Sequence, residues 1–141
     1  MPNLRSNILN SLAFTTLVLT GSLMFQSAYA ADTSPQAQLQ HWSTQAGAAG
    51  SSESGKIFFN QKHGKEWSCA SCHGAAPVKT GTHANTGKSI PPLAPAANDK
   101  AFTDTAKINK WFRRNCKDVL SRECTAAEKA DVIAYLISLK P

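Results

Sequence analysis

The stretch WSCASCHGAA, residues 67–76, determines how the rest of the sequence is interpreted. It contains one C-x-x-C-H motif, in which two cysteines attach a c-type haem covalently and the next histidine binds its iron. We therefore predict one haem, bound through Cys69 and Cys72, with His73 as an iron ligand. A C-x-x-C pair also occurs in thioredoxin-type redox sites and in zinc sites. The adjacent histidine, the export signal and the all-α pattern described below count against both, and the βαβ context of a thioredoxin-type site is also missing.

The first thirty residues have the pattern of a secretory signal peptide. Arg5 precedes an apolar stretch over residues 8–25, and Ala28 and Ala30 fit the small-x-small cleavage rule. We predict cleavage after Ala30, which leaves residues 31–141 as one mono-haem cytochrome domain without a membrane span. An uncleaved membrane anchor is the alternative, but polar residues interrupt the apolar stretch. Export places the mature chain in the periplasm, where disulfides form.

The charge balance favours some partners over others. The chain has 15 basic and 9 acidic residues. Arg5 is the only charged residue of the leader, so residues 31–141 carry a net charge of +5. A positive net charge favours binding of an acidic partner protein, or it serves only to keep the chain soluble. The lysines are interpreted as spread out along the chain rather than clustered. Nucleic acid is not expected, because export separates the chain from it and no binding motif is visible.

The patterns of capping residues and apolar positions predict an all-α fold without strands. Ser34-Pro35 and Gly47 bound a first helix, and residues 55–64 form a second helix that ends at Gly64 after a flexible link. Residues 74–99 are rich in proline and glycine and predict a long loop around the haem edge. A final helix begins with the capping box Thr125-Ala-Ala-Glu128.

A helix capped near Thr103 follows the loop. Ile108, Trp111, Phe112, Asn115 and Val119 fall on one stripe of it, which predicts that Asn115 lies on the buried face.

Two cysteines remain outside the haem motif. In an oxidising compartment a disulfide between Cys116 and Cys124 is their simplest use, and two buried thiols are the alternative.

The residues alone do not identify the second axial ligand of the iron. Met1 and Met24 are the only methionines, and both lie in the predicted leader. Asn115, His83 and no protein ligand at all are the three remaining possibilities. A loop histidine is usually a surface residue, and a helix-interior asparagine is usually hydrogen-bonded in the core.

Two stretches, GKSIPPLAPAAN and FTDTAKINKWFRRNCKDVLSRECTAAEKADVIAYL, closely resemble the sphaeroides haem protein (SHP) family of cytochromes c. The similarity extends from about residue 32 to residue 139, and its most specific part is Arg114-Asn115-Cys116 with Cys124 eight positions later. It implies a class I cytochrome c fold, Asn115 as the distal iron ligand, and a disulfide at Cys116. It also implies loss of the asparagine ligand on reduction, binding of oxygen or nitric oxide, and electron donation by a dihaem cytochrome c.

These observations favour a periplasmic ligand-binding cytochrome, which would admit oxygen, carbon monoxide or nitric oxide beside Trp111, Phe112 and Leu93. One alternative is a plain electron carrier with His73 and His83 as permanent ligands. Another is an enzyme at the same iron, an oxidase or a nitric oxide dioxygenase, and the family leaves that question open.

Overall fold

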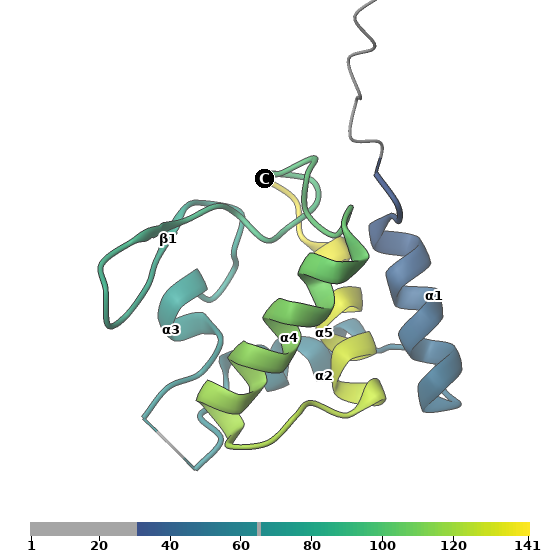
Figure 1. Ribbon diagram of the computed structural model, residues 1–141, viewed down its shortest axis with the longest axis horizontal. Coiled ribbons are helices and arrows are strands. Elements are labelled where there is room, and N and C mark those ends of the chain that lie inside the picture. The colour runs from purple at the N-terminus through teal and green to yellow at the C-terminus, as the bar shows by residue number, and fades with distance from the viewer. Residues whose placement is uncertain (1–30, 65) are drawn as a thin grey trace, which may run out of the picture.

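The computed structural model describes residues 31–64 and 66–141, so the predicted leader lies outside the described residues (Figure 1). The described chain folds into five helices and one small hairpin. These are α1 (Pro35–Ala46), α2 (Ser52–Asn60), α3 (Ala70–His73), β1 (Gly81–Thr82), β2 (Ser89–Ile90), α4 (Thr105–Leu120) and α5 (Ala126–Ser138). Within these residues no helix has the length and apolar character needed to cross a bilayer.

Helix α1 follows its capping signals. The Ser34 hydroxyl accepts a hydrogen bond from the Ala37 N–H, and Pro35 occupies the first turn. The helix ends at Gly47, whose φ of 67° lies in the left-handed region that glycine adopts without strain. The predicted first helix is therefore confirmed at both ends.

Helix α2 begins earlier and ends earlier than the sequence suggests. Ser51 caps it by accepting from the Ser54 N–H, so part of the predicted flexible link is helical, and the helix stops at Asn60 rather than Gly64. Gly55 allows α2 to cross α5 closely, because a Cβ at this position would overlap the backbone carbonyl of Asp131. Burial against α5 thus extends the helix into a stretch whose composition suggests a linker.

Helix α5 is the centre of the core, with α1 and α2 packed against it. Val132, Tyr135 and Leu136 of α5 form one buried cluster with Phe59 of α2. A second cluster joins Trp42 of α1 to two other residues of α5, Ala130 and Ile133. The predicted all-helical core is confirmed, because helices supply all the residues of both clusters.

The proline- and glycine-rich segment between α3 and α4 contains two short strands that the sequence does not predict. Gly81 pairs with Ile90 and Thr82 with Ser89 in an antiparallel hairpin. Its turn is closed by the His83 N–H, which donates to the Lys88 carbonyl over 2.8 Å. Each strand has only two residues, so side-chain alternation leaves no detectable pattern in the sequence. The expectation of no long regular element holds, and the expectation of no strand is wrong.

Helix α4 is capped by Asp104, one residue after the expected position. The Asp104 carboxylate accepts from the Lys107 N–H over 2.8 Å. Ile108, Cys116 and Val119 are the buried residues of the helix. Phe112, half-buried on the same helix, packs against both buried clusters of the core.

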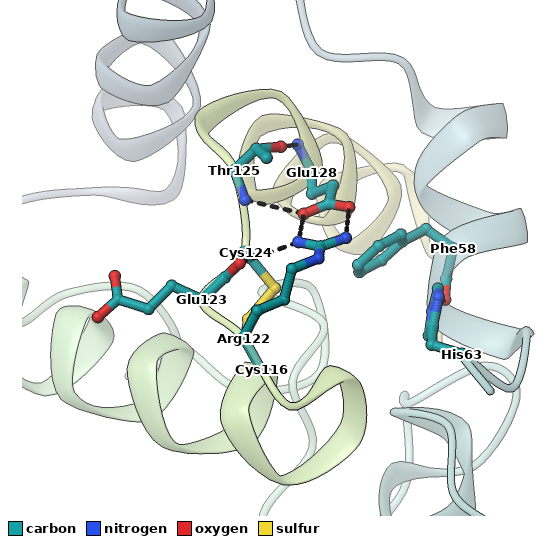
Figure 2. The surroundings of a disulfide bond; sticks show 8 residues. All are labelled: Phe58, His63, Cys116, Arg122, Glu123, Cys124, Thr125 and Glu128. Carbon is teal, nitrogen blue, oxygen red and sulfur yellow. Dashed lines mark hydrogen bonds and ion pairs between the residues drawn. A yellow bond between two sulfur atoms is a disulfide. The ribbon is translucent and has the colours of Figure 1, made fainter. Parts of the chain in front are cut away.

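The turn between α4 and α5 is held by several bonds close together (Figure 2). Cys116 and Cys124 are joined by a disulfide, with their Cα atoms 5.5 Å apart. Thr125 and Glu128 form the predicted capping box at the start of α5. The Arg122 guanidinium donates two hydrogen bonds, of 2.8 and 2.6 Å, to the Glu128 carboxylate. The end of α4 is thereby fixed to α5.

Glu128 should make the stability of this turn pH-dependent. Its pKa lies below the ordinary value of 4.5, because of hydrogen bonds from Arg122 first and from the Thr125 backbone next. A depressed folded-state pKa adds stability above pH 4.5, and this contribution disappears as the pH falls through the folded value. We expect Glu128→Gln to lower the thermal midpoint of the holoprotein by a few degrees at pH 7. The two proteins should converge in acid, and parallel curves would contradict this role.

Candidate haem site

The C-x-x-C-H motif forms a single helical turn. The N–H groups of Cys72 and His73 both donate to the Cys69 carbonyl, and the Ser71 hydroxyl accepts from the Ser68 N–H. Gly74, with φ of 78°, ends the turn. Two thiols and one imidazole are therefore presented together by α3, as a haem attachment site requires.

Cys69, the residue before α3, and Cys72 within α3 are free thiols, and both are partly buried. Burial raises the pKa of Cys69 to about 11, with a smaller opposing effect from its backbone hydrogen bond. Cys69 therefore stays a neutral thiol, which is a poor partner for disulfide exchange. The Ala84 N–H from the hairpin turn lies 3.3 Å from the Cys72 sulfur, and it holds the hairpin against α3.

His73 has the properties of a neutral iron ligand. Burial lowers its pKa, and the nearby charge of His83 lowers it further. An imidazole that stays neutral keeps a lone pair for a metal. The ring packs near the fully buried Phe59, with 6.2 Å between ring centroids.

The residues around α3 fix it to the core. Cys69 and Ala70 pack against the buried cluster that contains Phe59. The Tyr135 hydroxyl of α5 donates to the Ala75 carbonyl, just after the motif. Gly81 of β1 lies so close to the Cys72 carbonyl that a Cβ there would overlap it. The motif is thus held in place by two contacts. Helix α5 binds the chain just after it, and β1 packs against the Cys72 carbonyl.

The surroundings of Cys69 fit a large planar apolar group. Leu93, Phe102 and Phe112 are partly buried and pack against the same cluster as Cys69. Trp111, one position from Phe112 on α4, is 44% exposed, which is unusual for so large an apolar side chain. Two free thiols, a neutral histidine and these apolar side chains suit a covalent haem. Of the predicted pocket residues, the structure brings Leu93 and Phe112 to the cluster, whereas Trp111 remains at the surface.

Asn115 is exposed, so the expectation that it lies on the buried face of its helix is wrong. At 3.6 residues per turn, Asn115 lies about 20° to one side of Ile108 around the α4 axis, and Cys116 lies about 80° to the other. Phe112 packs against both buried clusters, and Cys116 and Val119 are buried on the same side of the helix. Trp111 and Asn115 form the neighbouring flank, which packs against neither buried cluster of the described residues.

The other histidines have local partners among the described residues. His41 is exposed and accepts from the Gln45 side chain. His63 donates from Nε2 to the Phe58 carbonyl over 2.8 Å. His83 is also exposed, and its Nδ1 accepts from the Asn85 N–H over 3.3 Å, which leaves Nε2 of His83 as a potential ligand atom.

The basic residues are less evenly spread than the sequence interpretation holds. Five of them are exposed on α4: Lys107, Lys110, Arg113, Arg114 and Lys117. Asp118 is the only acidic residue of that helix. Counting charges over residues 105–120, once a helix is predicted there, would have found this cluster.

Comparisons of sequence identify relatives along most of the chain. Residues 45–136 match a family described as a domain of unknown function, DUF1924. The cytochrome c-type protein SHP of Cereibacter sphaeroides is 40% identical over 126 residues, which are 86% of this chain and 97% of that protein. Cytochrome c'' of Methylophilus methylotrophus is 50% identical over 88 residues, which are 60% of this chain and 61% of that protein. The matched stretch thus spans about three fifths of cytochrome c''.

Solved structures agree with these relatives. The structure of oxidised SHP, described as an oxygen-binding cytochrome c, superposes with a TM-score of 0.71 at 43% identity, and covers 77% of this chain and 99% of that one. Oxidised cytochrome c'' from Methylophilus methylotrophus superposes with a TM-score of 0.70 at 40% identity, and covers 76% and 95% of the two chains. With the haem motif, the helical core and these matches, the chain belongs to the SHP family of c-type cytochromes, with the class I-like helical fold and one c-type haem.

Proposed function

We propose that this protein is a periplasmic ligand-binding cytochrome in which Asn115 is a displaceable iron ligand. The observation that carries the proposal is the position of Asn115, which is an exposed amide beside Trp111 on the flank of α4. It lies next to Cys116, whose disulfide fixes this end of α4. The described residues contain no methionine, so the usual sulfur ligand has no source there.

Asn115 suits one oxidation state better than the other. The haem supplies an iron centre that exchanges one electron. An amide oxygen is a hard, weak donor that binds ferric iron better than ferrous iron. Asn115 would therefore bind the iron in the ferric protein and would be displaced more easily after reduction. The same side chain then has an amide N–H free to donate a hydrogen bond.

The opened position suits a small diatomic ligand. Phe112 and Leu93, which pack against the same buried cluster as Cys69, and Trp111, which is exposed on α4, would supply apolar groups there that disfavour water and accept oxygen, carbon monoxide or nitric oxide. The description of the SHP structure as an oxygen-binding cytochrome c supports this proposal.

The proposal includes a cellular setting. Removal of the leader over residues 1–30 would deliver the chain to the periplasm, and a dihaem cytochrome c or a similar redox protein would reduce it. The net charge of +5 on residues 31–141 supports an acidic partner.

A plain electron carrier with His73 and His83 as ligands is the second candidate. His83 lies close enough to His73 for its charge to lower the His73 pKa, and its Nε2 is available. Both axial positions would then be filled in both oxidation states. Such a protein would bind no external ligand.

Visible spectra of the holoprotein with carbon monoxide test the proposal. We expect a high-spin ferrous spectrum that changes on addition of carbon monoxide, because the sixth position is open. A low-spin ferrous spectrum that carbon monoxide leaves unchanged would replace the proposal with the bis-histidine carrier.

A further inference from the structure

The charge of the protein is concentrated on one helix. Residues 31–141 carry a net charge of +5, and α4 alone, with five basic residues and one acidic residue, carries +4. The other 95 residues of that range together carry a net charge of only +1. One helix of 16 residues therefore dominates the electrostatic field that an approaching molecule meets.

The basic residues of α4 form no ion pair among the described residues, and only Lys110 and Arg114 contact an aromatic ring, that of Trp111 on the same helix. All five are exposed, and the one ion pair among residues 31–64 and 66–141 joins Arg122 to Glu128 outside α4. Lys110 and Arg114 are four positions apart, as are Arg113 and Lys117, and like charges at this spacing destabilise a helix. Lys117 lies in the last turn, where a positive charge favours the helix, but helix stability does not account for the two like-charged pairs.

Four of these residues form a continuous strip, which we call the cationic stripe: Lys107, Lys110, Arg114 and Lys117. At 3.6 residues per turn they lie within an arc of about 80° around the α4 axis. The stripe borders the flank that carries Trp111 and Asn115. The Lys110 ammonium and the Arg114 guanidinium lie 5.6 and 5.3 Å from the centre of the Trp111 ring.

We propose that the cationic stripe is the docking site of an acidic electron-donor protein. This inference rests on the proposed function, because it names the surface on which the redox partner binds. Opposite charges on two proteins accelerate their encounter and fix their orientation. Because the stripe lies beside Trp111 and Asn115, a donor bound there would approach the proposed haem pocket on the side of these two residues.

Stopped-flow reduction of the ferric holoprotein tests this surface, with reduced flavodoxin as the acidic donor. The test variant is Lys107→Gln/Lys110→Gln/Lys117→Gln. The control is Lys56→Gln/Lys62→Gln/Lys140→Gln, which removes the same charge from exposed lysines elsewhere. At low ionic strength we expect the test variant to react about tenfold more slowly and the control less than twofold. The difference should vanish at 1 M salt, where charges are screened beyond about 3 Å.

Two outcomes would overturn the proposal. Equal slowing of both variants would mean that only the net charge matters. An unchanged rate for the test variant, together with loss of its binding to phosphatidylglycerol vesicles, would assign the stripe to an anionic membrane surface. Carbon monoxide binding, measured on the same proteins, reports separately on the proposed function. A stripe-dependent rate in a protein that refuses carbon monoxide would therefore overturn the proposed function and leave the docking site standing.

Discussion

Replacing Asn115 by methionine should abolish carbon monoxide binding by the reduced protein and raise its reduction potential. A thioether is a soft donor that binds ferrous iron well, so it would stay on the iron after reduction. Methionine ligation is the arrangement by which cytochromes c reach high potentials. We expect a low-spin ferrous spectrum that does not respond to carbon monoxide, and a potential, measured by redox titration, well above that of the wild type.

Asn109→Met is the matched control, because Asn109 is also an exposed asparagine of α4 but lies about a third of a turn from Asn115 around the axis. Its spectra should equal those of the wild type. Asn115→Ala should leave the iron accessible in both oxidation states and change the ferric spectrum. If Asn115→Ala leaves the ferric spectrum unaltered while His83→Ala changes it, His83 is the ligand and the proposal for Asn115 is wrong.

The sequence predicts those parts of the fold that depend on local signals. The boundaries of α1 and the start of α5 follow from Ser34, Gly47 and the Thr125–Glu128 capping box, which act within a few residues of chain. The start of α2 is not predicted, because Ser51, its cap, lies in a stretch with the composition of a linker, and the contacts of Ser51 and Gly55 with Asp131 join residues 80 and 76 positions apart in the sequence. The hairpin was missed because two-residue strands have no periodicity.

The residues of the candidate site also differ in how well local sequence signals predict their positions. Cys69, Cys72 and His73 form one helical turn, so their grouping follows directly from their spacing. Asn115 was expected to be buried because it lies within the apolar stripe of α4, yet only one side of that stripe packs against the protein core. The other side of the stripe, which carries Trp111 and Asn115, does not pack against the core of the described residues. A bound haem would give this side an apolar surface to face, and hydrophobic periodicity does not distinguish a residue that faces the protein core from one that faces a cofactor.

Removing the disulfide should cost more stability than any single interaction in the turn between α4 and α5. Cys116 and Cys124 are 8 positions apart, and closing so short a loop stabilises the folded state by about 2.5 kcal/mol on the chain-entropy model. We expect Cys116→Ala/Cys124→Ala to lower the unfolding free energy of the holoprotein by this amount. Denaturant titration, monitored by circular dichroism, would measure it.

Removing the disulfide should also change the iron site, because Cys116 follows Asn115 directly on α4. Ser121 ends α4 with φ of 63°, a strained value for a residue other than glycine, and the disulfide helps to hold that turn. A released α4 end would place the Asn115 amide less precisely, so the ferric spectrum should shift toward that of Asn115→Ala. Arg122→Gln, which breaks the ion pair of the turn but keeps the disulfide, should leave the spectrum unchanged. Recovery of both cysteines as alkylated peptides without prior reduction would contradict the disulfide, and the shift of the spectrum would then need another cause.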